Sequence, residues 1–232
     1  MKNIFSITFL LMLCTTKILF AQFEGRKFLS GSASVNLINS KPENGNVTSS
    51  YGYNFDMSMG TFKTNTRSAG WRLSNSIVGG KQTFSYYNGN ETVYYDNTGI
   101  RNAGVGIGRF WQFYKHFNNK TGIFAGPGVD LRFSHGSSYT TATDYRTLYN
   151  GKENMISLSA GLSAGIYYQF SEKWWVTASL AFASPVSVDY SFLSNDNITE
   201  NTNYKQQLLN YRFSPDFTFP SVGFGLRYFL AK

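Results

Sequence analysis

The residue pair best suited to chemistry in this 232-residue chain is His135 and Ser137, which lie two positions apart. A histidine beside a serine can take the hydroxyl proton and so activate the oxygen as a nucleophile. No acidic residue can be assigned from the sequence as the group that orients this histidine. An ordinary polar segment is therefore the competing interpretation. The other histidine, His116, is expected in a short turn without an obvious partner.

A second candidate is a set of charged residues within segments that are expected to be strands. They share the sequence parity of small polar residues, which places them on an interior face; they are Asp56, Arg72, Asp130, Arg132 and Arg227. The set would either form a hydrogen-bonded network that fills a narrow interior or line a narrow path for ions. Asp56 and Arg72 are expected near each other, because they flank the turn between consecutive segments.

Tyrosines are concentrated in the polar connections between the expected strands. Segment 81–99 is the clearest example: Asn88-Gly89 at its centre predicts a hairpin turn, and the segment carries Tyr86, Tyr87, Tyr94 and Tyr95. Tyrosine supplies rigid contact area with a polar tip, which suits a recognition surface. Packing among loops, or an aromatic girdle at a membrane interface, is the alternative.

Residues 1–21 have the pattern of a secretory signal peptide. Lys2 gives a positive start, and Ile4–Leu13 is apolar. The only cysteine, Cys14, lies in this segment. The exported chain, residues 22–232, would then hold no disulfide, no thiolate metal site and no cysteine nucleophile. No cofactor, no metal and no enzymatic activity are expected.

The charge balance bears on the partners. Removing the signal peptide, which contains two lysines, would lower the formal net charge from +8 to +6. The remaining charges are scattered along a chain that is expected to be exported. Acidic lipid headgroups therefore fit better than nucleic acid as the partner of this basic chain.

The stretch Met155–Phe170 defines the fold class. Its even-numbered residues from Ile156 onward are apolar, whereas the residues between them are small or polar. Strict alternation predicts a strand with one apolar and one polar face. Its serines and glycines are too small to fill the core of a soluble sandwich, so the pattern favours a transmembrane barrel strand with its apolar face toward lipid.

Further segments alternate in the same way; they are 28–38, 50–61, 69–80, 100–113, 122–133, 174–183 and 217–230. Their connections are alternately long and short: Asn39–Ser49, Phe62–Ser68, Lys81–Gly99, Tyr114–Thr121, Ser134–Asn154, Ser171–Lys173 and Ser184–Asp216. Transmembrane barrels pair short periplasmic turns with long extracellular loops, and an even number of strands closes the sheet. The sequence predicts an all-β fold, an eight-stranded antiparallel up-and-down transmembrane β-barrel over residues 22–232.

One place departs from the regular pattern. Arg109 continues the outward parity of its strand, and an arginine near the bilayer midplane costs roughly 2–4 kcal/mol. Pro127, about opposite on the next segment, lacks the N–H that a ladder needs. We expect a β-bulge near this pair, with Arg109 turned inward or toward the membrane interface.

With these features in place, the exported chain resembles a small eight-stranded outer-membrane barrel of the OmpA/OmpX type. Gly225-x-x-Tyr228-x-Leu230 resembles the C-terminal signal that the barrel-assembly machinery reads. The resemblance implies the outer membrane of a Gram-negative bacterium. It implies a monomer whose partners are outer-membrane lipid, lipopolysaccharide, the assembly machinery and an extracellular ligand.

Three functions stay open at this point. The first is a structural or surface-interaction role through long Tyr-rich extracellular loops, without enzymatic activity. The second is a small pore for ions or small solutes. The third is a lipid A-modifying hydrolase, because His135-x-Ser137 resembles the His-x-Ser pair of lipid A deacylase, although Ser138 stands where that family has asparagine.

Overall fold

The structure, a computed structural model, describes residues 23–40, 48–142, 146–181, 186–197, 200, 202–213 and 222–230. The expected signal peptide lies outside these residues. The described chain forms β1 (Lys27–Ser40), β2 (Thr48–Thr64), β3 (Arg67–Tyr87), β4 (Thr92–His116), β5 (Thr121–Thr141), β6 (Leu148–Gln169), β7 (Trp174–Ala181), β8 (Val186–Asn197), β9 (Thr202–Phe213) and β10 (Val222–Phe229). In this part of the chain, no helix has the length and apolar character needed to cross a membrane.

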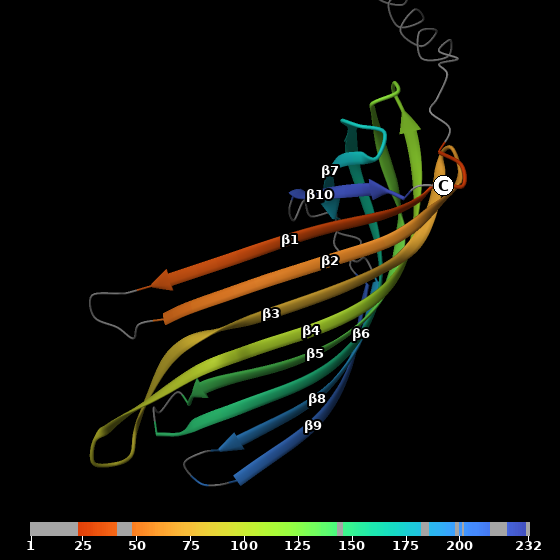
Figure 1. Cartoon of the computed structure of the whole chain (residues 1–232). Coiled ribbons are helices and arrows are strands. Elements are labelled where there is room, and N and C mark those ends of the chain that lie inside the picture. Colours follow the sequence, from red (N-terminus) through yellow and green to blue (C-terminus); the bar gives the residue numbers. More distant parts are fainter. Residues whose placement is uncertain are drawn as a thin grey trace, which may run out of the picture.

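The strands form one antiparallel sheet that curves back on itself like a ring (Figure 1). Strands β1 to β6 are neighbours in chain order. On the far side of β6, β7 pairs with residues 163–169 and β8 pairs with residues 149–160. Strand β9 pairs with β8, and β10 pairs with both β7 and β1. The predicted all-β, antiparallel, up-and-down architecture is confirmed.

The described residues form ten strands where the sequence predicts eight, and the loop predicted over Ser184–Asp216 accounts for the difference. This segment contains β8 and β9, and β8 extends the pairing along β6 beyond β7. Its Asn, Ser and Thr residues favour a loop, but Val188 and Tyr190 alternate with them on one face. The backbone N–H and C=O groups of β6 need hydrogen-bond partners. Because this segment lies beside β6 and can supply them, it forms strands in spite of its polar composition.

The loop predicted over Ser134–Asn154 is also wrong. Strand β5 extends to Thr141, and β6 begins at Leu148, with a single register between them. By contrast, the hairpin predicted within segment 81–99 is confirmed, because β3 and β4 pair as far as Tyr87 and Thr92. All three predicted short turns are confirmed as tight connections between consecutive strands.

The two faces of the sheet differ in the way that the alternation predicts. Along β6, the outer side chains Leu158, Leu162 and Ile166 are 49%, 43% and 59% exposed. The serines and glycines between them lie on the inner face. At the end with the short turns, the inner face is instead filled by buried rings, here called the aromatic floor: Phe23, Phe28, Phe62, Phe110, Tyr114, Phe124, Tyr167, Trp175 and Phe229.

The ring of strands closes through a short contact. Strands β1 and β10 pair only from Phe28 opposite Phe229 to Gly31 opposite Leu226. Within the described residues, Ser32–Ser40 has β2 as its only strand partner, and β9 has only β8. Figure 1 shows the far ends of β1 and β9 separated from each other. The sheet is thus closed at the aromatic floor and open at the opposite end.

The irregularity expected near Arg109 is present, but its form differs from the prediction. Pairing between β4 and β5 is interrupted at Trp111 and Gln112, opposite Pro127, without a change of register. Arg109 keeps its outward parity, and its guanidinium carbon lies 4.9 Å from the centroid of the Trp71 ring. Stacking on tryptophan, rather than a bulge that turns the side chain inward, accommodates this arginine.

A bulge occurs elsewhere on β4. Val78 pairs with Asn102 and Gly79 pairs with Ile100, so Arg101 is an extra residue without an opposite partner. An extra residue reverses the alternation beyond it. Two positions further on, Gly80 pairs with Gly99, and both have a φ of +142°. Beyond this pair the hairpin lies against β5, where the Tyr95 and Tyr139 rings are 5.1 Å apart.

This geometry makes Gly80 and Gly99 a matched pair for substitution. Both positions have the same strained φ, but a Cβ at Gly80 would lie 2.0 Å from the carbonyl oxygen of Ser49, whereas a Cβ at Gly99 would meet nothing within 4 Å. We expect Gly99→Ala to lower the free energy of unfolding by about 1–3 kcal/mol through backbone strain, and Gly80→Ala to lower it further. Urea titration of both variants measures the difference, and equal losses would contradict the close contact at Gly80.

Candidate functional site

Two hollows lie on the inner face of the sheet. The first, the interior cavity, has a volume of about 490 Å³ and is lined by residues of β1 to β7 and β10. All five charged residues predicted to face inward are among its lining residues: Asp56, Arg72, Asp130, Arg132 and Arg227. The second, the rim hollow, has a volume of about 500 Å³ and lies at the open end, on β5, β6, β8 and β9.

Four of the five charged residues in the interior cavity have hydrogen-bond partners, namely Arg72, Asp130, Arg132 and Arg227. Arg72 Nε donates to Asp130 Oδ1 at 3.1 Å and its NH2 group donates to Asp130 Oδ2 at 2.5 Å, which is a two-point ion pair. Arg132 donates to Ser76 Oγ. The sequence places Asp56 beside Arg72, and the pairing of Ser58 with Arg72 puts Asp56 one row away on the same face. The arrangement resembles a space-filling network more than a row of unpaired charges.

Arg227 lies within the aromatic floor and is only 4% exposed. Its Nε donates to Ser30 Oγ at 2.9 Å, and its two other nitrogens donate to Tyr114 Oη at 2.5 Å and Gln112 Oε1 at 3.1 Å. Its guanidinium carbon lies 4.1 Å from the centroid of the Phe28 ring. The three acceptors are neutral, so hydrogen bonds and ring faces together stabilise this buried cation.

The aromatic floor blocks the interior at the end with the short turns. Tyr167 and Trp175 stack with their centroids 4.0 Å apart, and Trp175 meets Phe229 edge-on at 4.8 Å. His116 extends the same layer, in contrast to the expectation that it has no partner. It is buried, its Nδ1 is hydrogen-bonded to Tyr167 Oη, and its Nε2 lies 2.7 Å from the carbonyl oxygen of Asn65. Its position in a ring-lined layer, and not in an exposed turn, explains the error.

The structure gives His135 a partner other than Ser137. Both residues lie on β5, and His135 Nδ1 shares a hydrogen bond of 2.8 Å with Asn154 Oδ1 on β6. Ser137 is opposite Lys152 in the same ladder. A nucleophile needs its base within hydrogen-bond reach, and among the described contacts the imidazole is bonded to an amide instead.

The tyrosines of the β3–β4 hairpin divide into two groups. Tyr87 and Tyr94 are 39% and 68% exposed. Tyr86 is half-buried, and so is Tyr95, whose hydroxyl lies 3.3 Å from that of Tyr139 on β5. This hydrogen bond raises the pKa of Tyr139 to about 12. The hairpin therefore offers two exposed rings and uses the Tyr95 ring for packing against β5.

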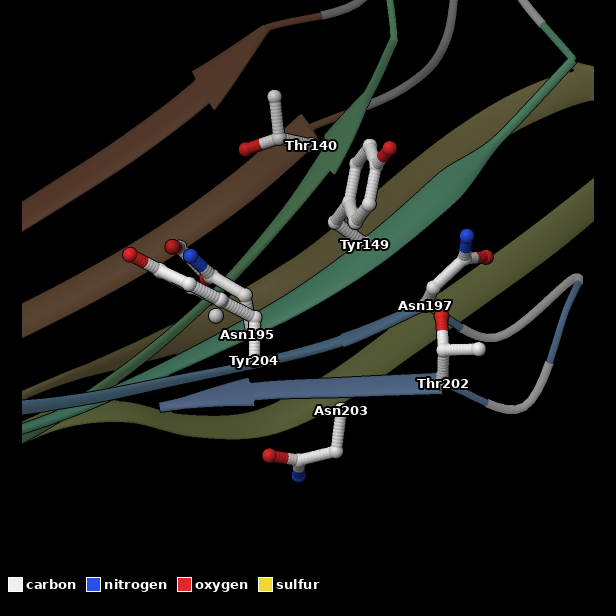
Figure 2. Close-up of a pocket in the computed structure, with 9 residues that line it drawn as sticks. Thr140, Tyr149, Asn195, Asn197, Thr202, Asn203 and Tyr204 are labelled. Carbon is white, nitrogen blue, oxygen red and sulfur yellow. The ribbon is translucent and has the colours of Figure 1, made fainter. Parts of the chain in front are cut away.

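The rim hollow was not predicted, because it lies in segments that the sequence assigns to loops. Its lining residues are Ser138 and Thr140 of β5, Tyr149 and Gly151 of β6, Asn195 and Asn197 of β8, and Thr202, Asn203 and Tyr204 of β9. Figure 2 shows that these side chains come from neighbouring strands, with Tyr149 and Tyr204 on different ones. Strand alternation was the signal that could have found it, since Ser138 and Thr140 continue the parity of Asp130 and Arg132 along β5.

No protein-family model matches the chain, and a search of curated proteins finds no match. Among the described residues, no group of three or more His, Cys, Asp or Glu side chains could hold a metal ion. The features of the described residues that bear on function are therefore the two hollows, the aromatic floor and the outer face.

The buried arginine of the floor gives a direct test of this packing. Lysine keeps the charge of Arg227 but cannot donate to three acceptors in a planar fork. We expect Arg227→Lys to lower the free energy of unfolding by about 1–3 kcal/mol. Arg212→Lys on β9, where the side chain is exposed, should change it by less than about 0.5 kcal/mol. Urea titration followed by tryptophan fluorescence measures both, and equal effects would contradict the role of Arg227.

Proposed function

We propose that the chain is an outer-membrane β-barrel. Its strands span the lipid, and the strand ends at the open end of the sheet form a binding surface. One observation carries this proposal: a row of outer side chains crosses consecutive strands in register without a polar residue. The row consists of Met57, Leu73, Ile107, Leu131, Leu158, Val188 and Tyr211. The members on β2 to β6 are 41% to 49% exposed.

An exposed row of apolar side chains of this kind is costly in water. Soluble monomers rarely expose large apolar patches, because each Å² of apolar surface in water costs about 25 cal/mol. Lipid chains remove that cost on the outer face, while the polar inner face retains its cavity. The short turns would then lie on the periplasmic side, and the open end with the rim hollow would lie outside the cell.

The surface-interaction role fits the open end better than it fits the interior. The β3–β4 hairpin and the β8–β9 hairpin extend past the row, and their residues are largely polar, with exposed rings such as Tyr94 and Tyr204. Surfaces rich in Tyr, Ser, Gly and Asn are typical of recognition sites, because rigid rings give contact area and small polar groups adapt. The rim hollow has this composition.

Two other functions fit the geometry less well. A pore needs a path past the aromatic floor, where rings and Arg227 are packed in contact. Single-channel conductance in planar bilayers would favour the pore. A lipid A-modifying hydrolase needs a base for Ser137, and His135 is bonded to Asn154. Altered lipid A in cells that express the chain, detected by mass spectrometry, would favour the hydrolase.

The barrel is tested by its resistance to detergent. Where the ring of strands is closed, its paired backbone groups are not free for detergent to disrupt. We expect the folded protein to migrate differently on a denaturing gel before and after boiling. A refolding titration into detergent micelles serves as the control for complete folding. If fully folded and boiled samples migrate together, the proposed barrel is wrong.

The lipid-facing assignment is tested at Leu162. Leu162 lies on the outer face of β6, so an arginine there would meet lipid chains, at a cost of roughly 2–4 kcal/mol near the bilayer midplane. We expect Leu162→Arg to impair insertion into lipid vesicles. Thr98→Arg is the matched control, because Thr98 is exposed on the hairpin beyond the bulge. Normal insertion of Leu162→Arg together with failure of Thr98→Arg would reverse the assignment of the two regions.

A further inference from the structure

We propose that the rim hollow binds an uncharged carbohydrate. This inference rests on the proposed function, because it requires the open end of the sheet to face the medium outside the cell. It goes further by naming the chemical class of the ligand. Four features of the hollow carry it: uncharged side chains at every described lining position, side chains that both donate and accept, exposed tyrosine rings, and a glycine that leaves room.

The described residues of the lining include no acidic and no basic side chain. The nearest ion pair, Lys152 with Asp196 at 3.2 Å, has the opposite strand parity and therefore lies on the outer face. Glu200 is bonded to the Asn197 side chain, whose Nδ2 donates to its carboxylate at 3.0 Å. Among these described lining residues, an acidic ligand would find no cation and a basic ligand no carboxylate, so their side chains would not compensate the desolvation of either.

The polar groups of the lining match ligand hydroxyls. Side-chain amides and hydroxyls both donate and accept hydrogen bonds, and sugar hydroxyls do the same. Asn197 is occupied by Glu200, and Asn203 donates to Ser194 Oγ at 3.2 Å on the outer face. Figure 2 shows Asn203 on the opposite side of β9 from Tyr204. The groups that remain on the hollow side include Asn195, Thr140 and Thr202.

Two rings offer flat apolar surface beside these polar groups. Tyr149 on β6 is 37% exposed, and Tyr204 on β9 is 62% exposed. A tyrosine combines an apolar ring face with a polar tip. The C–H face of a sugar ring can pack on such a ring while its hydroxyls bond to the neighbouring amides. A purely polar ion or small anion would leave this ring surface unused.

Gly151 makes the space. A Cβ at this position would lie 2.9 Å from Asn195 Oδ1 and 3.4 Å from Ser138 Oγ. Because glycine has no side chain, the space between these polar groups of β5 and β8 stays empty. The volume of about 500 Å³ is within the range of small-molecule sites, about 300–1,000 Å³. The hollow lies on the face of the sheet, whereas a peptide strand would add along the free edge of β9. The geometry therefore favours a compact ring-shaped ligand.

The test measures binding of neutral oligosaccharides to the full chain folded in a detergent without a sugar headgroup. The probes are oligomers of glucose, mannose, galactose and N-acetylglucosamine, with polygalacturonate and heparin fragments as acidic comparisons. We expect at least one neutral oligomer to bind with a dissociation constant below about 1 mM, measured by calorimetry. Acidic fragments should bind more weakly than neutral ones of equal length.

Three variants locate the site. Tyr204→Ala removes a ring and Gly151→Leu fills the hollow, and each should weaken binding by about tenfold or more. Tyr168→Ala is the matched control, because Tyr168 is an exposed tyrosine of β6 that lies outside the hollow, so its loss should leave binding within about twofold. If Gly151→Leu does not fold, Tyr204→Ala and Tyr168→Ala still decide the question.

Failure of this inference is separable from failure of the proposed function. Protein that shifts on the gel after boiling but binds no neutral oligomer would overturn the carbohydrate site and leave the barrel intact. Binding that survives Tyr204→Ala, that prefers acidic fragments, or that is replaced by binding of an extended peptide would also overturn it. Protein that never acquires heat-modifiable migration would overturn the proposed barrel instead.

Discussion

The packing of large rings on an inner face that otherwise carries small residues is the constraint on which the structure depends. Several of the aromatic rings have space because a neighbouring strand presents glycine. A Cβ at Gly60 would lie 2.4 Å from Phe28 Cζ, one at Gly70 would lie 2.5 Å from Phe110 Cζ, and one at Gly165 would lie 2.5 Å from Phe124 Cζ. Aromatic rings on strand glycines are a recurrent way to fix curvature and register in closed sheets.

Closure of the ring follows from the same packing. The pairs that join β1 to β10 include Phe28 opposite Phe229 and Ser30 opposite Arg227, and all four residues belong to the aromatic floor or its hydrogen bonds. Above the floor, the inner face returns to Ser, Gly and Thr, which leaves the interior cavity. Within that cavity Arg72 and Asp130 form an ion pair, which offsets the hydration that each charge would lose there.

The sequence predicts the features of the fold that depend on alternation along one strand. It does not predict the features that depend on pairing with neighbouring strands. The outward orientation of Leu158 and Leu162 can be predicted, because period-two alternation needs no tertiary information. Strands β8 and β9 depend on the pairing of β8 with β6. Composition does not reveal this pairing, so the sequence predicts a loop at Asn195 and Tyr204. The five inward charges were identified by parity, but the ion pair of Arg72 with Asp130, 58 positions apart, follows from register and not from spacing.

The free edges explain why recognition and membrane insertion would occupy different ends. In water, an unpaired strand edge is tolerable when polar and charged side chains discourage pairing with other chains. Strand β9 carries Lys205 on its part near the rim hollow, in agreement with that rule, whereas Tyr211 of the same strand belongs to the apolar row. In lipid, every backbone group needs a partner, so the proposed membrane location sets a condition on Ser32–Ser40. The pairing of β1 with β10 ends at Gly31 opposite Leu226, and its register continues toward Gly225. A Cβ at Gly225 would lie 3.3 Å from the carbonyl oxygen of Gly31, so the next residues of the two strands are already close. Ser32 and Gly225 therefore lie close together where the closed pairing ends, whereas the far part of β1 and all of β9 have a single strand partner each among the described residues.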